Sequence, residues 1–471
     1  MISWYEVYSK TLEQASKKSI KDRNTIIGFN VNIDKIVEIT PESIDWKLPD
    51  GIDLKLKNGK LRLPSRVNSI EDFFLYLMDS MMNGKAVEVG VTSEEIADWI
   101  ENSFEIENVQ IGGQAGIIAN LFKNIEVGNV LLSLPTYDAQ FAKLLNPALL
   151  TVVEEGNSHT ICEINKLKFT DNEPISHYIF EFKAGNYELN SLKFVCPRDN
   201  RFIFSYDTVN GLVKFNKGFH EFSPNYVIEY SLAIISGFCL ANEQLSSFEE
   251  IFDPIIEMIK EWKKINPNLF IHMELASTYN AKKRSYIKEN LFPLVNSIGV
   301  NEQELLLFSS IKEEQKAIKS DDIYTSTTLF HYLHELFLEY PHLRIHLHYL
   351  GYFLVMSPIM NNKEAEGAKE ALIMSSYFAA SKAKKGTIES FQDIYDVELD
   401  LSSKGFDELR NLHSYLKSQF KVKGNLYETG ILETPSFSLV GVPTILVKNP
   451  QKLVGLGDTI SSIAVLFDTN D

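Results

Sequence analysis

The sequence is poor in cysteine, has no long apolar run and carries fewer basic than acidic residues. Its three cysteines, Cys162, Cys196 and Cys239, are odd in number and far apart. They indicate buried thiols in a reducing, cytoplasmic compartment and exclude a disulfide framework or a zinc site. No stretch reaches about 18 apolar residues, so we expect no membrane span.

Basic residues are also scarce, with 46 Lys and Arg against 63 Asp and Glu, a formal net charge of −17. Such a chain repels phosphates, which argues against a broad nucleic-acid surface. An anionic small-molecule substrate must therefore meet a local cluster of cations or backbone N–H groups. The chain contains no GxxxxGK[ST] motif, which excludes the P-loop class, and the absence of GxGxxG weakens a dinucleotide-binding interpretation.

What is present is ordinary for a globular enzyme, with 44% hydrophobic residues, 30 Phe and 20 Tyr in 471 residues. Apolar strands alternate with helical patterns, which is typical of a mostly parallel sheet covered by helices on both faces. Two segments instead show alternating polarity and turn signals, which predicts antiparallel hairpins, at residues 40–65 and 158–225. We therefore expect an α/β protein with a large domain and a smaller, β-rich lid built from two insertions.

The domain boundaries follow from these segments. The large domain is predicted to comprise residues 1–38, 111–157 and 226–471, and the lid residues 39–110 and 158–225. The last part of the large domain carries most of the candidate functional motifs. Its last strand is predicted at residues 442–447.

A glycine-rich segment near the C-terminus, VGLGDTISS (454–462), leads into the last predicted helix. Free N–H groups at a helix N-terminus favour an anion, and Gly455 and Gly457 let the backbone approach a phosphate closely. Asp458 would repel that phosphate, so it makes chemical sense there as a general base for an attacking alcohol. An aspartate that caps an ordinary helix is the alternative interpretation.

Polar residues also follow three predicted strands. Asn32 and Asp34, in GFNVNIDKI, come just after the first apolar strand, where open α/β sheets bind ligands, and they suit sugar hydroxyls. Glu274 in HMELAS, with Asn301 and Glu304 in NEQE, follows two later strands, and carboxylate and amide oxygens are suitable Mg²⁺ ligands, direct or through water. Solvated turns are the alternative for each segment.

RIHLHYLGYFL (344–354) is predicted as a strand with alternating His346 and His348. No third ligand is nearby, so a zinc site is not expected. A packed aromatic beside a nucleotide base is the functional interpretation, and an ordinary core position is the structural one.

Together and in this order, the motifs resemble those of one family, the ADP-dependent sugar kinases of archaea. These are the ADP-dependent phosphofructokinases and glucokinases of the ribokinase-like superfamily. The resemblance runs from GFNVNID through GGQAGIIAN, HYIFEFKAG, PRDNRFI, HMELAS, NEQEL and RIHLHYLGY to VGLGDTIS. It implies a ribokinase-like α/β domain with a sheet-containing lid, and phosphoryl transfer from ADP to a sugar in a modified glycolysis.

The resemblance also implies roles for individual residues. Asp458 would be the catalytic base, and the amides of Gly455, Gly457 and Asp458 would form an anion hole. Glu274 and Glu304, beside Asp458, would organise Mg²⁺, with Asn301 on the nucleotide side. The sugar would be faced by Asn32, Asp34, Gly113, Gln114 and His177. Tyr352 and the backbone around Val447 would hold the adenine.

The choice of sugar rests on three further residues. Glu88 in GKAVE matches a family glutamate that goes with glucose binding, whereas Lys183 and Arg201 resemble basic residues of the phosphofructokinases. A 6-phosphate needs such cations in an acidic chain. The combination favours fructose 6-phosphate as the main substrate with glucose as a second, and an ADP-dependent glucokinase is the alternative.

Two more distant alternatives are an ATP-dependent ribokinase-like sugar or nucleoside kinase and a non-catalytic nucleotide-binding relative. Asp458, Glu274 and Glu304 are all present, which argues against the second. The ADP preference rests on the resemblance and not on the motifs' chemistry.

Overall fold

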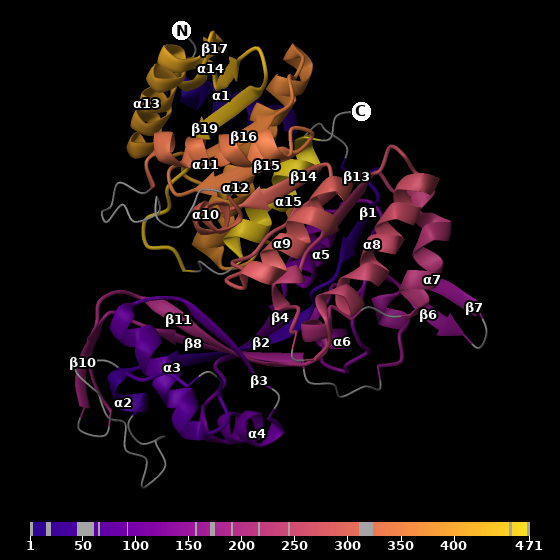
Figure 1. The fold of residues 1–471 in the computed structure, drawn as a ribbon, viewed down its shortest axis with the longest axis vertical. Coiled ribbons are helices and arrows are strands. Elements are labelled where there is room, and N and C mark those ends of the chain that lie inside the picture. Colours follow the sequence, from indigo (N-terminus) through magenta and orange to yellow (C-terminus); the bar gives the residue numbers. More distant parts are fainter. Residues whose placement is uncertain are drawn as a thin grey trace.

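The computed structural model shows an α/β protein in which helices cover both faces of a large sheet and a smaller sheet lies to one side (Figure 1). It describes residues 3–15, 20–44, 61–64, 66–91, 93–155, 158–169, 175–189, 192–214, 217–243, 245–309, 324–451 and 455–468. Within these ranges, no helix is both long and apolar enough to cross a membrane.

The large sheet has twelve strands, and its central strands are parallel. In spatial order they are β17 (Lys423–Asn425), β18 (Ile431–Glu433), β19 (Ser438–Pro443), β16 (Tyr352–Ser357), β15 (Arg344–Tyr349), β14 (Ser297–Val300), β13 (Phe270–Glu274), β12 (Leu232–Ile235), β1 (Thr25–Gly28), β5 (Val130–Leu132), β6 (Leu150–Glu155) and β7 (Ser158–Glu163). Antiparallel strands complete both edges.

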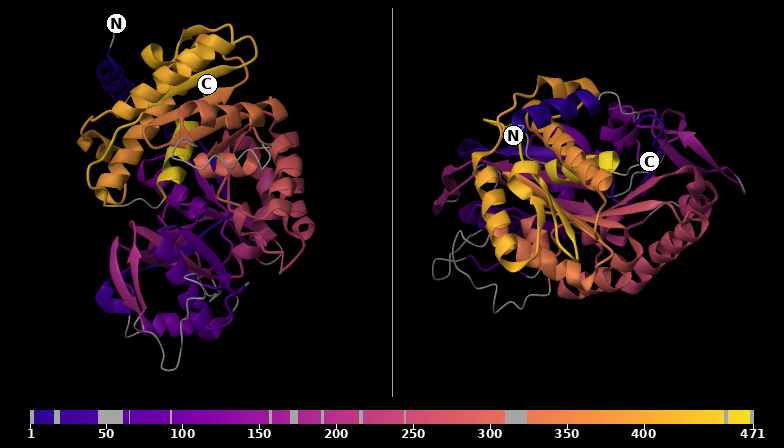
Figure 2. Two further views of the ribbon diagram at one scale, coloured as in Figure 1. Left: turned by 60° about the vertical axis from the view of Figure 1, so that its left-hand side comes forward. Right: turned by 90° about the horizontal axis from the view of Figure 1, so that it is seen from above.

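Two apolar cores lie on the two faces of this sheet, and neighbouring residues of one strand divide between them. Ile26 packs into one core and Ile27 into the other, as the alternation of side chains along a strand requires. The first core is covered by α8 (Phe248–Ile265), α9 (Ala281–Asn290), α10 (Glu302–Phe308), α11 (Ser326–Glu339) and α13 (Ser403–Gln419). The second is covered by α1 (Trp4–Ala15), α5 (Gln114–Asn124), α12 (Asn362–Lys385) and α15 (Leu456–Asp468). Figure 2 shows these helices on both sides of the sheet.

The smaller sheet has five strands in the order β3 (Val87–Val91), β11 (Asn200–Asp207), β8 (Ile175–Phe182), β2 (Asn32–Ile39) and β4 (Asn108–Gly112). One face is covered by α3 (Ile70–Asn83) and α4 (Glu94–Ser103), whose apolar side chains form a third core. The side chains of Phe73, Phe74, Leu77 and Met81 on α3 are fully buried. The other short elements are α2 (Pro41–Ile44), α6 (Phe141–Leu144), α7 (Lys217–Tyr226), α14 (Leu426–Thr429) and the hairpin of β9 (Gly185–Leu189) and β10 (Leu192–Cys196).

The predicted fold class is confirmed, but two predicted boundaries are displaced. β2 already belongs to the smaller sheet, so the chain leaves the large sheet before residue 38. β7 alternates in polarity because it is a half-exposed edge strand of the large sheet, paired with β6, and not part of the lid. Residues 45–60, where hairpins were expected, lie outside the described residues, and residues 41–44 are helical.

Two strand predictions in the large sheet are also corrected. Residues 344–354 form two antiparallel strands, β15 and β16, because Gly351 has a φ of 109° and turns the chain back. The last strand ends at Pro443, earlier than the predicted end at Val447. Residues 444–447 therefore leave the sheet, and they line the cavity described next.

Candidate active site

A cavity of about 680 Å³ lies between the two sheets, at the carboxyl ends of the central parallel strands. The large sheet contributes residues at the ends of β13, β14 and β15, and the smaller sheet contributes residues of β2, β3, β8 and β11. It is the position at which open parallel sheets bind ligands. Most of the predicted site residues line this cavity: Asn32, Asp34, Glu88, Gly113, Gln114, His177, Arg201, Glu274, Asn301, Glu304, Val447, Gly455, Gly457 and Asp458.

The glycine-rich turn lies at the N-terminus of α15, as expected. Gly455 has a φ of +69°, a conformation that favours glycine, and α15 begins at the next residue. Gly457 lies so close to His348 that an added Cβ would be 3.0 Å from the imidazole Nε2. The first helical turn therefore presents backbone N–H groups beside the Asp458 carboxylate, which is the arrangement an anion hole with a base requires.

Asp458 lies in the first turn of α15 at the wall of the cavity. Burial raises the pKa of its carboxyl above the ordinary value. The Lys382 ammonium, a hydrogen bond from Gln114 and the Arg201 guanidinium all oppose that rise in pKa. Lys382 and Gln114 come from helices α12 and α5, which pack on the large sheet, and Arg201 comes from β11 of the smaller sheet. Groups from both parts of the protein therefore affect the ionisation of Asp458.

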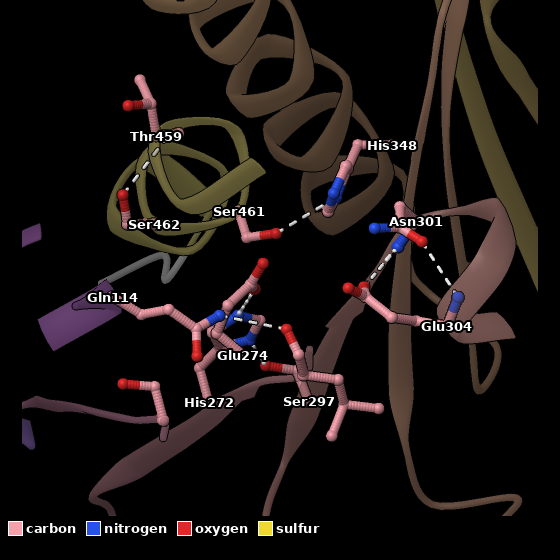
Figure 3. A network of polar contacts seen from close by, with 12 residues as sticks. Gln114, His272, Glu274, Ser297, Asn301, Glu304, His348, Thr459, Ser461 and Ser462 are labelled. Carbon is pink, nitrogen blue, oxygen red and sulfur yellow. Dashed lines mark hydrogen bonds and ion pairs between the residues drawn. The ribbon is translucent and has the colours of Figure 1, made fainter. Parts of the chain in front are cut away.

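Glu274, the last residue of β13, is only 3% exposed and lies at the centre of a polar network (Figure 3). Its Oε2 is 3.3 Å from the Nε2 atom of His272, whose Nδ1 is 2.7 Å from the Ser297 hydroxyl. An added Cβ at Gly299 would lie 2.0 Å from the same Glu274 oxygen, so only glycine leaves room for it. Burial, and after it the charges of Asp458 and Glu304, raise the pKa of the Glu274 carboxyl well above its usual range.

Asn301 and Glu304 form a capping box at the start of α10, with two reciprocal hydrogen bonds of 2.9 Å. Burial raises the pKa of Glu304 to about 8, although hydrogen bonding from the Asn301 backbone opposes the rise. The charge of Asp458 contributes to the same rise. The three carboxylates of Glu274, Glu304 and Asp458 thus repel one another in one cavity.

This donor set fits a divalent cation held partly through other ligands. Among the residues that the structure describes, no three His, Cys, Asp or Glu side chains are close enough together to hold a metal by themselves. Mg²⁺ keeps several water ligands and is usually held by one or two carboxylates together with substrate phosphates. A cation at Glu274 and Glu304 would offset the burial and the mutual repulsion that raise their pKa values.

The opposite wall, on the smaller sheet, carries hydrogen-bonding groups suited to a sugar. Asn32 donates a hydrogen bond of 2.7 Å to Asp34, and His177 Nε2 lies 3.0 Å from Asp207. The Ser205 hydroxyl donates to Glu88 at 2.8 Å. Burial alone would lower the pKa of His177, but Asp207, followed by Glu88 and Asp34, raises it to about 9. The imidazole is therefore a cation at neutral pH, surrounded by carboxylates.

Two predicted site residues are not part of the cavity lining. Lys183 lies just past the end of β8, exposed, and pairs with Asp199 at 3.3 Å. Tyr352 is fully buried at the start of β16, behind the half-exposed Tyr349, which lines the cavity in its place. The turn at Gly351 places Tyr349 and Tyr352 on different strands, and the structure does not bring Tyr352 to the cavity where its predicted adenine role would place it.

Sequence reasoning missed Lys382 and Asp207. Lys382 lies in a lysine-rich helix end, KAKK, where a solvated face is the ordinary expectation, so no sequence signal marked it. Asp207 was recognisable, because it follows Arg201 and Ser205 at even spacing along one strand, and side chains at that spacing share a face.

A smaller sheet beside a large sheet with parallel central strands, a carboxylate in the first turn of a helix and acidic residues at the adjacent strand ends are the arrangement of a kinase that phosphorylates a hydroxyl group. The chain belongs to the ADP-specific phosphofructokinase/glucokinase family, whose conserved region matches residues 23–467.

Individual relatives are similar over nearly the whole length. The chain is 29% identical over 476 residues to the ADP-dependent glucose/glucosamine kinase of Pyrococcus abyssi, covering 99% of both chains. It is 28% identical over 448 residues to the ADP-specific phosphofructokinase of Thermococcus zilligii, covering 92% of this chain and 93% of that protein. A solved ADP-dependent kinase in complex with fructose 6-phosphate and ADPβS superposes with a TM-score of 0.83 at 27% identity, covering 99% of this chain and 98% of that one.

Proposed function

We propose that the protein transfers the β-phosphoryl group of ADP to fructose 6-phosphate, giving fructose 1,6-bisphosphate and AMP. The observation that carries the proposal is the position of Asp458, in the first turn of α15 and in one cavity with the polar groups of the smaller sheet. The similar kinase solved with fructose 6-phosphate and ADPβS supports the same pair of substrates.

In this mechanism the sugar hydroxyl lies beside Asp458, which accepts its proton as the oxygen attacks the β-phosphorus. The bond from that phosphorus to the bridging oxygen breaks in line, and AMP leaves. Backbone N–H groups of Gly455, Gly457 and Asp458 stabilise the charge on the transferred group. Val447 and the other residues that continue from β19 along the cavity hold the adenine.

Glu274 and Glu304 would hold Mg²⁺, which supplies charge neutralisation at the phosphates when it is bound. Their burial, their raised pKa values and their place beside Asp458 support this assignment. Asn301 fixes the Glu304 carboxylate through the capping box and so acts through that residue.

On the sugar side, Asn32, Asp34, Gly113, Gln114 and His177 would bind hydroxyl groups. Arg201 lines the cavity and is the cation we assign to the 6-phosphate. Lys183, paired with Asp199 outside the cavity, contributes less than its motif suggests.

Glucose is the second candidate acceptor, and Glu88 favours it. Its carboxylate accepts from Ser205 and lies 3.9 Å from His177 Nδ1, inside the cavity, where it can bind a neutral hydroxyl. The similarity to the Pyrococcus abyssi glucose/glucosamine kinase supports this activity.

A coupled assay of ADP and ATP against fructose 6-phosphate and glucose tests the proposal. We expect AMP formation from ADP with fructose 6-phosphate, and a lower kcat/KM with glucose. Turnover with ATP and none with ADP would contradict the donor assignment and favour an ATP-dependent kinase. No turnover with either donor would favour a non-catalytic nucleotide-binding protein. We further propose a cytoplasmic location, supported by the three cysteines, which form no disulfide in the described structure.

A further inference from the structure

A buried lysine contacts the glycine-rich turn at the N-terminus of α15. Lys382, near the end of α12, is 8% exposed. Its ammonium donates hydrogen bonds to the Gly455 carbonyl at 2.8 Å and to the Thr459 hydroxyl at 3.1 Å. Burying an ammonium group is costly unless hydrogen bonds and opposite charge compensate it. The two hydrogen bonds hold the positive charge of Lys382 at a fixed place beside the turn.

The two bonds span the whole turn that precedes and opens α15. Gly455 has a positive φ, and its carbonyl oxygen also accepts from the Thr459 N–H at 3.3 Å. Because the Gly455 carbonyl oxygen accepts a hydrogen bond from the ammonium, this oxygen does not face the anion that the turn is proposed to bind. An added Cβ at Gly455 would lie 2.8 Å from the ammonium nitrogen, so the two groups fit closely.

The ammonium also bears on the charge balance of the site. Glu274, Glu304 and Asp458 place three carboxylates in the cavity, and phosphorylated substrates bring further negative charge. Lys382 is the cation that most strongly opposes the raised pKa of Asp458, ahead of Arg201. Arg201 belongs to the smaller sheet, whereas Lys382 is fixed to the same layer of helices as Asp458.

We propose that Lys382 is a positioning residue for phosphoryl transfer, which holds the Gly455–Thr459 turn in its anion-accepting conformation. The inference rests on the proposed kinase function. It assigns to one lysine the task of fixing the shape of the anion hole.

The pH profile of kcat separates this role from simple structural support. In Lys382→Met the base loses a neighbouring cation, so the acidic limb of the profile should move to higher pH. We expect kcat at neutral pH to fall about 100-fold, as for the loss of one charge-stabilising donor. Lys382→Arg keeps the charge and should keep the position of the limb.

The cavity behind the turn allows a chemical rescue. Lys382 and Thr459 also line a second cavity of about 510 Å³, so truncation in Lys382→Ala opens a space that a small amine can enter. Added butylammonium should restore part of kcat, while tetramethylammonium, which has no N–H donor, should not. Lys369→Met is the matched control, because Lys369 is 9% exposed on the same helix but pairs with Glu366.

A Lys382→Met enzyme with wild-type kcat and an unshifted acidic limb would overturn the proposal. So would a loss of kcat with no shift of the limb and no amine rescue, since that pattern is the result of a purely structural role. Failure of the kinase function itself would instead be visible in the wild-type protein, as no AMP formed from ADP with either sugar. Thermal unfolding of each variant identifies any loss caused by misfolding.

Discussion

Asn301 and Glu304 each cap the backbone N–H group of the other across the first turn of α10, with both hydrogen bonds at 2.9 Å. The NxxE sequence therefore begins the helix and also fixes the position of the Glu304 carboxylate. The cap fixes the direction of Glu304 relative to β14, at the edge of the cavity that Asp458 also lines.

Removing the Glu304 charge should weaken the metal site and leave the helix start nearly intact. In Glu304→Gln, the amide oxygen can still accept from the Asn301 N–H, so we expect a change in melting temperature of only a few degrees. The Mg²⁺ concentration for half-maximal rate should rise about tenfold, a loss of roughly 1.4 kcal/mol. The matched control is Glu364→Gln, which alters the exposed capping box of α12. An equal shift in both variants would remove Glu304 from the metal site.

The same carboxylate predicts how the stability of the metal-free protein depends on pH. The pKa of Glu304 is raised to about 8 in the folded state, so the folded chain holds a proton that the unfolded chain has released between about pH 4.5 and 8. The free energy of unfolding should therefore fall as pH rises through this window. Urea unfolding at pH 5 and pH 8 checks the sign. The fall should be smaller in Glu304→Gln and in wild type with Mg²⁺, and a rise with pH would contradict the assignment.

Asp458→Asn should lower kcat by a factor of roughly 10² to 10⁴, because an amide cannot accept the hydroxyl proton. ADP affinity, measured by calorimetry, should change little, since the backbone N–H groups of α15 remain. Turnover close to wild type would exclude Asp458 as the base.

The charge of His177 should depend on Asp207. In Asp207→Asn the hydrogen bond and charge that raise the pKa of His177 are lost, so the imidazole should become neutral at a lower pH than the value of about 9. We expect KM for the sugar to rise more at pH 8 than at pH 6, while ADP affinity is unchanged. Asp199→Asn, which alters an exposed pair with Lys183, is the control. A KM that is independent of pH in Asp207→Asn would contradict a charged His177 in sugar binding.

Single substitutions should affect the KM values for fructose 6-phosphate and glucose differently. Arg201→Ala should raise KM for fructose 6-phosphate about tenfold, from ~1.4 kcal/mol of lost binding, and leave KM for glucose nearly unchanged. Glu88→Ala should do the reverse, and Lys183→Ala should change neither strongly, because Lys183 lies outside the cavity lining. Equal losses on both sugars from Arg201→Ala and Glu88→Ala would indicate structural roles.

The sequence predicted those site residues that stand at ends of regular elements. Glu274, Asn301 and Asp458 were recognisable because polar residues follow apolar strands or open a helix, and parallel strands bring their carboxyl ends together. Lys382 was not recognisable, because the helical period predicts which face of the helix a lysine occupies but not which groups its ammonium contacts. Lys183 and Tyr352 were misplaced for a related reason: each lies at a turn, and only the turn's geometry decides whether its side chain faces the cavity.

The two sheets are assembled from segments far apart in the chain, and this sets an order for folding. Asp34 of β2 lies opposite His177 of β8, and β3 has β11 as its partner in the sheet. During synthesis, β3 emerges more than 100 residues before the strand that it pairs with. Contacts between residues so distant in sequence form slowly. The smaller sheet, which forms the sugar side of the cavity, should therefore fold late. Until β11 is synthesised, β3 has an unpaired edge that can bind chaperones or aggregate.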